Sequence, residues 1–213
     1  MNVLNLYAGI GGNRKLWKNV NVTAVEYDAE TAKVYKDLYP QDNVIVGDAH
    51  QYLLEHYKDY DFIWASPPCP THSDIRRCGV HAGRYEAKYP EMELYQEIIL
   101  MQHFAPRKTC WVIENVVPYY DCLIKPSIKL DRHLYWCNFF IDNFKVVKDK
   151  NDKPITHITP NSTVYGLNLK HTNIKDKRKA LRNMVNPELG LHILKYAQKH
   201  LSIKSYRQQT LFT

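Results

Sequence analysis

Short apolar runs alternate with stretches of helical spacing over roughly the first half of the chain. The apolar runs, which have the length and composition of buried strands, are residues 2–7, 22–28, 43–49, 61–66 and 109–116. Between them, apolar positions recur at the spacing of one helical face, which predicts helices at residues 14–19, 29–39, 50–57 and 91–104. Strands and helices that alternate in this way predict an α/β fold whose mostly parallel sheet carries helices on both faces.

After residue 130 the pattern changes. We expect two further strands at residues 134–141 and 144–147, followed by a charged turn at 148–154. A basic helix is expected at residues 175–183 and a last amphipathic helix at 187–200, with a polar tail behind it.

The net charge of +7 is concentrated in one part of the chain. Residues 145–182 hold ten Lys and Arg but only three Asp, so this segment alone accounts for the whole excess of positive charge. A local excess of this kind suits contact with a polyanion such as a nucleic acid. The alternative is a solvated, lysine-rich surface loop.

Apolar run lengths and cysteine usage narrow the class of protein further. The apolar runs are far shorter than the roughly 18 residues that span a bilayer, and the first residues lack a basic start, so we expect neither a membrane span nor a signal peptide. The five cysteines are scattered and odd in number, which favours a reducing, cytoplasmic compartment over a disulfide framework.

A glycine-rich turn at residues 8–12 (AGIGG) follows the first expected strand. Its spacing differs from the G-x-G-x-x-G of dinucleotide-binding folds, but glycine still lets a ligand approach the backbone closely. Glu26 lies 17 residues after Gly9, at the end of the second strand, where a carboxylate can accept hydrogen bonds from ribose hydroxyls. Asp48, after the third strand, is placed to accept from an adenine amino group. These strand ends favour an adenosine-type cofactor without a phosphate chain, and a plain tight turn is the alternative.

One cysteine stands among three prolines after the fourth strand, at residues 66–70 (SPPCP). Because prolines fix the backbone around it, Cys69 is a candidate nucleophile at the ligand edge of the sheet. A structural cysteine is one alternative. The other is a small zinc site, since Cys69, His72, Cys78 and His81 form a C-x2-H-x5-C-x2-H string. The short, proline-stiffened spacing disfavours zinc, and we expect no metal site.

A carboxylate, Glu114, stands near the end of the fifth strand in the triplet Glu-Asn-Val. Burying a carboxylate is costly unless it has a partner. Beside Cys69, Glu114 could hold or protonate a ring nitrogen; a helix-cap or salt-bridge role is the alternative.

In order, the segments NLYAGIGG, VEYD, GDA, ASPPCP and IENV resemble the motifs of the DNA cytosine-5 methyltransferase family. The matches are collinear and span residues 3–117, and residues 182–187 (RNMVNP) resemble the family's last motif, which folds back to complete the cofactor pocket. The resemblance implies a Rossmann-like, S-adenosylmethionine-dependent methyltransferase fold with a small basic C-terminal recognition segment. It implies S-adenosyl-L-methionine as the cofactor.

The resemblance also assigns roles to residues of this chain. Cys69 is implied to be the nucleophile, Glu114 to hold and protonate the N3 edge of the base, and Arg132 to hold the carbonyl O2. Cofactor contacts are implied for Tyr7, Ala8, Gly9, Ile10, Gly11, Gly12, Glu26, Tyr27, Asp48, Ala49, Pro68, Asn183 and Val185. Nucleic-acid contacts are expected from Arg76, Arg77 and Arg84, in a loop at residues 71–90, and from Lys175, Lys177, Arg178 and Lys179.

The chain departs from the family pattern at several positions. Pro70 stands where the family usually has glutamine, and Arg182 where it usually has glycine. The family's Gln-x-Arg-x-Arg strand is reduced to residues 130–135, where Arg132 maps best and His133 is a candidate to share its role. Only about 45 residues take the place of a sizeable target-recognition domain. This last departure bears on sequence specificity rather than on the chemistry.

The implied reaction is methyl transfer from S-adenosylmethionine to carbon 5 of cytosine in DNA through a covalent adduct with Cys69. The base would be flipped out of a duplex or lie in a single strand. The alternatives are an RNA (tRNA) substrate, a modified sulfonium donor, and a catalytically inactive nucleic-acid-binding subunit.

The implied organisation is a catalytic domain at residues 1–135, a minimal basic recognition segment at 136–181, a C-terminal helix at 182–202 that completes the catalytic domain, and a tail at 203–213. The expected partner is DNA, with a separate specificity partner as an option, in a monomer or weak dimer. The expected location is the cytoplasm of a bacterial or phage-infected cell.

Overall fold

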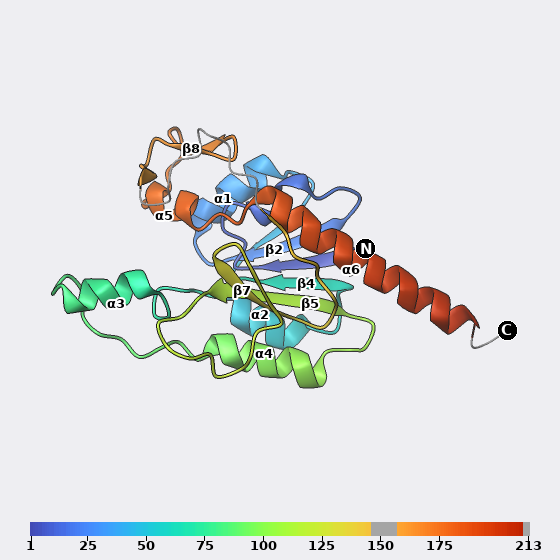
Figure 1. Ribbon diagram of the computed structural model, residues 1–213. Coiled ribbons are helices and arrows are strands. Elements are labelled where there is room, and N and C mark those ends of the chain that lie inside the picture. The colour runs from blue at the N-terminus through green and yellow to red at the C-terminus, as the bar shows by residue number, and fades with distance from the viewer. Residues whose placement is uncertain (146–156, 211–213) are drawn as a thin grey trace.

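A computed structural model describes residues 1–145 and 157–210, with backbone only for 205–210. Seven strands form one sheet in the order β3-β2-β1-β4-β5-β7-β6 (Figure 1). The strands are β1 (Asn2–Leu6), β2 (Asn21–Glu26), β3 (Asn43–Val46), β4 (Phe62–Ala65), β5 (Cys110–Val116), β6 (Ile128–Leu130) and β7 (His133–Cys137). The first five are parallel, whereas β7 runs antiparallel to both β5 and β6. The predicted α/β fold is confirmed.

Helices cover both faces of this sheet (Figure 1). On one face, α2 (Ala49–His56) and α4 (Glu93–Phe104) pack against a core that contains Leu4, Ile63 and Ile113. On the other face lie α1 (Ala29–Leu38) and α6 (Pro187–Thr210). Because the central strand β4 is buried on both sides, its continuous apolar run is what the fold requires.

Several elements differ from the sequence-based expectation. The helix expected at residues 14–19 is only a short 3-10 turn, η1 (Asn13–Leu16), because the backbone is already extended at Trp17 (ψ 131°). The strand expected at 134–141 ends at Cys137, although Phe139 and Ile141 stay in the core. The last helix extends past the expected end at residue 200 to Thr210.

The strand expected at 144–147 and the charged turn at 148–154 lie almost wholly outside the described residues. Residues 144 and 145, which are described, have no strand conformation.

The loop expected at residues 71–90 contains a helix, α3 (Asp74–His81), that projects from the body of the molecule (Figure 1). Its N-terminus is capped by Ser73, whose side chain accepts a hydrogen bond from the backbone N–H of Arg76. A serine cap followed by an acidic first residue favours helix formation, a local signal that the sequence interpretation missed.

The basic segment folds onto the first half of the chain. It contains a two-stranded sheet, β8 (Thr163–Val164) with β9 (Leu167–Asn168), and the short helix α5 (Lys177–Arg182). The apolar side chains of this segment form one cluster with Ile10 of the glycine-rich turn and Val34 of α1; they are Ile158, Leu169, Ile174, Leu181 and Met184. The recognition segment expected from sequence therefore shares a core with the catalytic fold.

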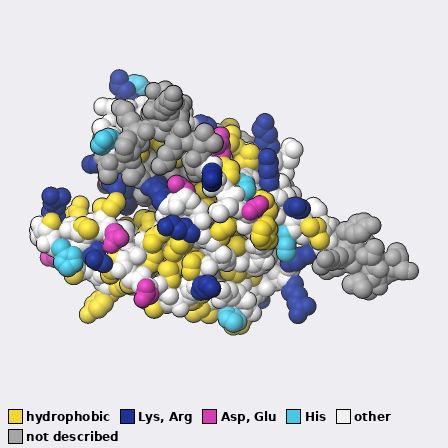
Figure 2. Space-filling model, viewed as in Figure 1, with side chains coloured by type: hydrophobic (Ala, Val, Ile, Leu, Met, Phe, Trp, Pro, Cys, Tyr) yellow, Lys and Arg dark blue, Asp and Glu magenta, His cyan; other side chains and the backbone are white. Residues whose placement is uncertain are grey.

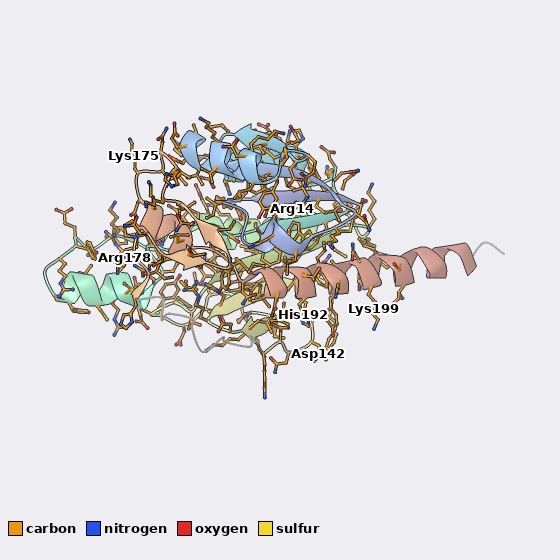
Figure 3. All side chains as sticks on the ribbon, turned by 90° about the horizontal axis from the view of Figure 1, so that it is seen from above. Arg14, Asp142, Lys175, Arg178, His192 and Lys199 are labelled. Atoms are coloured by element: carbon orange, nitrogen blue, oxygen red, sulfur yellow. The ribbon has the colours of Figure 1, made fainter. Side chains whose placement is uncertain are left out.

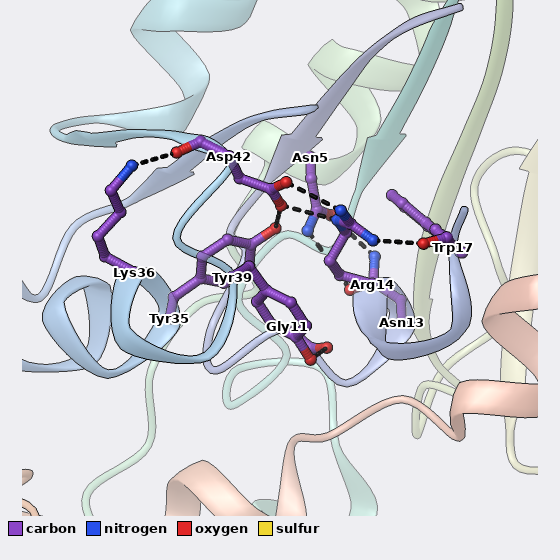
Figure 4. A network of polar contacts seen from close by, with 9 residues as sticks. All are labelled: Asn5, Gly11, Asn13, Arg14, Trp17, Tyr35, Lys36, Tyr39 and Asp42. Atoms are coloured by element: carbon purple, nitrogen blue, oxygen red, sulfur yellow. Dashed lines mark hydrogen bonds and ion pairs between the residues drawn. The ribbon is translucent and has the colours of Figure 1, made fainter. Parts of the chain in front are cut away.

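A buried polar network packs against the glycine-rich turn and contacts it at Gly11 (Figure 4). The Arg14 guanidinium donates two hydrogen bonds to the Asp42 carboxylate, at 2.7 and 2.9 Å, and Tyr35 donates a third at 2.9 Å. The Tyr39 hydroxyl donates to the carbonyl of Gly11 at 2.8 Å. Because the charges are paired and hydrogen-bonded, the network fixes the backbone on which the turn rests.

Among the helices that the structure describes, none combines the length and the apolar composition needed to cross a membrane.

Candidate active site

The strand ends singled out in the sequence meet at one edge of the sheet. Since β1 to β5 are parallel, the residues that follow them lie side by side at their carboxyl ends. This edge therefore carries the glycine-rich turn, Glu26, Asp48, Cys69 and Glu114. In open α/β sheets, ligands bind at this edge.

Glu26 is held against the glycine-rich turn. Its carboxylate accepts hydrogen bonds from the backbone N–H of Gly9 at 2.8 Å and of Asp28 at 3.0 Å. Each oxygen keeps a free lone pair for a further donor. Gly9 adopts φ +54°, and a side chain added there would meet no atom within 4 Å. Open space beside bare backbone and a fixed carboxylate fits an adenosine ribose and its sulfonium tail.

The residues that follow α5 pack closely against the glycine-rich turn. A side chain at Gly12 would collide with the backbone of Val185, whose carbonyl oxygen would lie 2.6 Å from its Cβ. A side chain at Gly190 would come within 2.4 Å of the Asn13 carbonyl oxygen. Both glycines are therefore required by close backbone packing. Residues 183–190 therefore fold back onto the turn.

The other expected cofactor residues fall into two groups. Asp48, whose side chain caps α2 by accepting from Gln51 N–H at 3.0 Å, is exposed at this edge, as are Tyr27, Pro68 and Asn183. Ala8, Ala49 and Gly11 are buried, and Ile10 points into the cluster with the basic segment. In this second group the backbone, and not the side chain, is what borders the edge.

Tyr7 reaches away from the edge to a residue that the sequence interpretation missed. Its hydroxyl donates to the carboxyl of Glu97 on α4, which also contacts His50 Nδ1 at 3.1 Å. Glu97 is fully buried, and burial raises its pKa. The available signal was an acidic residue within the apolar face of the helix expected at residues 91–104.

Cys69 lies in a tight turn beside Glu114. Its carbonyl accepts hydrogen bonds from the N–H groups of His72 and Ser73, and Asn115 ties β5 to the cysteine loop by donating to the Pro67 carbonyl at 3.0 Å. Burial, and then the Glu114 carboxylate, raise the pKa of the Cys69 thiol above its usual value.

Two cations act in the opposite direction on the Cys69 thiol. The positive charges of Arg132 and Lys179 lower its pKa, although the net shift is still upward. The thiol therefore lies within the electrostatic field of both the fifth strand and the basic segment.

Glu114 is buried, and its nearest basic partner is His133, not Arg132. His133 Nε2 lies 3.4 Å from Glu114 Oε1. Arg132 donates to the backbone carbonyl of Arg182 at 2.9 Å, and its expected role on the carbonyl of the base stays a prediction. Residues 131 and 132 form the turn between β6 and β7, with Asp131 at φ +51°, and residues 133–135 belong to β7.

The zinc alternative is not supported by the placement of its four residues. No cluster of three or more potential ligands occurs among the residues that the structure describes, which include all four. His72 is buried with Nδ1 on the Tyr120 hydroxyl, whereas Cys78 and His81 are exposed on α3.

A hydrogen bond joins the two ends of the α3 loop, and a cation–π contact lies within the loop. The N–H of Glu91 donates to Thr71 Oγ1 at 2.9 Å, which closes the loop. The Arg76 guanidinium lies 5.5 Å from the ring centre of Tyr85. Figure 2 shows Lys and Arg side chains on this projection among hydrophobic ones.

The expected nucleic-acid residues lie on two elements at the same end of the molecule. Arg77 and Arg84 are exposed and Arg76 is half-buried on the α3 loop. In α5 and the turn before it, Lys175, Arg178 and Lys179 are exposed and Lys177 is half-buried. Lys175 and Arg178 lie at the α3 end in Figure 3.

The sheet order and the matching family model together define the Rossmann-like class of S-adenosylmethionine-dependent methyltransferases. The family model "C-5 cytosine-specific DNA methylase" matches residues 1–116, more than half of the chain. The chain therefore belongs to this family, whose cofactor is S-adenosylmethionine. No curated protein sequence matches the chain.

Three solved structures illustrate the similarity. A DNMT2 mutant from Spodoptera frugiperda is 17% identical, over 64% of this chain and 48% of that one (TM-score 0.40). The methyltransferase EhMeth from Entamoeba histolytica is 14% identical, over 76% and 63% (TM-score 0.41). The plantazolicin methyltransferase BamL, in complex with a triazolic desmethylPZN analog and SAH, is 15% identical, over 54% and 38% (TM-score 0.35). The chain spans less than two thirds of the length of each.

Proposed function

We propose that this protein transfers a methyl group from S-adenosylmethionine to carbon 5 of cytosine in DNA, with Cys69 as the nucleophile. The observation that carries the proposal is the joining of Cys69 and Glu114 at the cofactor edge. The Asn115–Pro67 hydrogen bond links the two loops, and the Glu114 charge reaches the Cys69 thiol. A thiol beside a carboxyl group is the pair that covalent attack on a cytosine ring needs.

The residues of the edge would hold the cofactor through hydrogen-bond acceptors and close backbone packing. Glu26 would accept from the ribose hydroxyls and Asp48 from the adenine amino group, while Gly9 leaves room for the chain. When bound, S-adenosylmethionine would supply an electrophilic methyl group, and its sulfonium sulfur would leave as a neutral thioether.

Cys69 makes the target carbon reactive. The Cys69 thiolate adds to carbon 6 of the ring, forming a C–S bond, while Glu114 gives a proton to ring nitrogen N3 and prevents negative charge from building up. Carbon 5 then has enamine character. After methylation, solvent water takes the proton from carbon 5, the C–S bond breaks to release the Cys69 thiolate, and the N3 proton returns to Glu114.

The two basic elements supply the support for a DNA substrate. The α3 loop and α5 flank the edge, and cationic side chains there suit phosphate contacts. A base inside a duplex cannot reach Cys69, so the proposal includes flipping of the target cytosine or its presentation in a single strand. The basic segment expected at residues 136–181 is short compared with a full recognition domain, so the proposal includes a separate partner that supplies sequence specificity.

Incubation with tritiated S-adenosylmethionine tests the substrate class. With separate pools of DNA and total RNA, the wild-type protein is expected to label DNA and the Cys69→Ser variant to label neither. Label in RNA alone would overturn the DNA assignment. Label with the Cys69→Ser variant equal to wild type would overturn the assignment of the nucleophile.

A further inference from the structure

The pairing of β5 with β7 puts three polar side chains on one face of the sheet. Glu114 stands opposite Tyr135, and Val116 opposite His133. Directly opposed residues of an antiparallel pair share a face, and so do residues two apart on one strand. Glu114, His133 and Tyr135 therefore form one row, at the end of β5 that borders Cys69.

Within this row the imidazole and the carboxyl group meet in a nearly dry environment. The His133 and Glu114 side chains are 13% and 8% exposed, and His133 Nε2 is 3.4 Å from Glu114 Oε1. This separation is longer than a good hydrogen bond, so the pair can tighten when a ligand arrives. The contact also joins the hairpin of β6 and β7 to the strand that carries the catalytic carboxyl group.

Arg132 makes no direct contact with Glu114 among the described residues, although its charge acts on Cys69 and His133. It lies exposed in the turn before β7, and its guanidinium donates a hydrogen bond to the backbone carbonyl of Arg182 at 2.9 Å. That bond fastens the hairpin to the end of α5. The side chain of this hairpin that contacts Glu114 is His133.

We propose that His133 is a positioning residue for the reaction: its neutral imidazole holds Glu114 at the target ring in both its ionised and its protonated forms. This inference rests on the proposed function of Cys69 and Glu114. A neutral imidazole has one N–H and one lone pair, so it can donate to a carboxylate or accept from a carboxylic acid. A guanidinium, which is always charged and only donates, favours the carboxylate alone.

The surroundings keep the imidazole neutral. Burial lowers the pKa of His133 and the Arg132 charge acts in the same direction, whereas Glu114 and Asp131 oppose them. Below this lowered pKa the ring becomes a cation that holds Glu114 as a carboxylate, and the carboxyl proton needed at N3 is withheld. Activity is therefore expected to fall as the pH decreases through the pKa of His133, below its usual 6.5.

The third member of the row is Tyr135, which places its hydroxyl in the protein interior. Tyr135 is fully buried, and its hydroxyl has no hydrogen-bond partner among the residues that the structure describes. Burial raises the pKa of Tyr135, and the Glu114 charge acts in the same direction. An unsatisfied buried donor is costly, and such groups gather where a ligand completes the network.

Three variants test the role of His133, each assayed as the full chain with DNA and S-adenosylmethionine. His133→Phe removes both ring nitrogens and is expected to lower kcat about 10- to 100-fold, because Glu114 loses its alignment, with little change in the KM for S-adenosylmethionine. His133→Gln keeps a donor and an acceptor, so it is expected to retain more of the rate at neutral pH. It cannot titrate, and its pH profile should lack the wild-type low-pH limb. His103→Gln, at an exposed position of α4, is the matched control and should keep that limb.

The outcomes separate this inference from the proposed function. If His133→Phe, with an unfolding midpoint like wild type, retains the wild-type kcat, the inference is overturned. The same holds if His133→Gln retains the low-pH limb. If His133→Phe is unstable, the His133→Gln profile alone decides. The proposed function is tested by other variants and fails if Cys69→Ser or Glu114→Gln remains fully active.

Discussion

The Cys69→Ser variant is expected to form no covalent complex with DNA that contains 5-fluorocytosine. In such DNA fluorine replaces the proton of carbon 5, so the final elimination is blocked and the wild-type protein stays bound through its C–S bond. A serine hydroxyl at the same place is a far weaker nucleophile than a thiolate. We expect the rate of methyl transfer to fall by more than about 1,000-fold, by analogy with losses of other catalytic nucleophiles. Denaturing gel electrophoresis of the protein–DNA complex measures the adduct directly.

Cys78→Ser is the matched control for this experiment. Cys78 lies nine residues further along the same loop, on α3, and its side chain is exposed. The control is expected to trap DNA like the wild-type protein. A trapped complex with Cys69→Ser, or loss of trapping with Cys78→Ser alone, would place the nucleophile on a different residue.

Glu114→Gln is expected to lower the single-turnover rate by about 100- to 10,000-fold, the usual contribution of a general acid or base. The amide has nearly the same shape, and it can still hydrogen-bond to the ring, but it has no proton of the required acidity to give to N3. Cofactor affinity, measured by calorimetry, should change little because Glu26 and the glycine-rich turn are untouched. Glu188→Gln, at an exposed position of α6, is the control and should behave like wild type.

A wild-type rate for Glu114→Gln would contradict the role of this carboxyl group. A loss of cofactor affinity as large as the loss of rate would also contradict it, because Glu114 would then belong to the cofactor pocket.

The sequence predicts the ligand edge well because the edge follows from local patterns. An apolar run ends, the chain turns, and in a parallel sheet all such turns fall on one side. Glu26, Asp48, Cys69 and Glu114 could therefore be placed together before any contact was known. The confirmed family adds that S-adenosylmethionine is the cofactor.

The contacts within the edge depend on long-range pairing, which local patterns do not contain. That His133 rather than Arg132 faces Glu114 follows from the β5–β7 register, which brings residues 116 and 133 together. A shift of one residue exchanges the two faces of a strand, so neighbouring residues 132 and 133 could not be separated by sequence matching alone.

The packing of the basic segment also depends on long-range contacts that local sequence patterns do not contain. Its charge excess was visible in the sequence, but its packing was not. Ile10, from the glycine-rich turn, shares a cluster with Ile158 and Leu169 because residues far apart in the chain fold against each other. The role of the segment in nucleic-acid binding stays a prediction, as do the contacts of Lys175 and Lys179 with phosphates.

Bisulfite sequencing of methylated DNA tests the central claim most directly. DNA incubated with the wild-type protein and S-adenosylmethionine should contain cytosines that resist conversion, because a methyl group on carbon 5 protects them. The same DNA incubated with Cys69→Ser should be fully converted. Methyl incorporation without any protected cytosine, or equal protection by the Cys69→Ser variant, would contradict methylation of cytosine carbon 5 through Cys69.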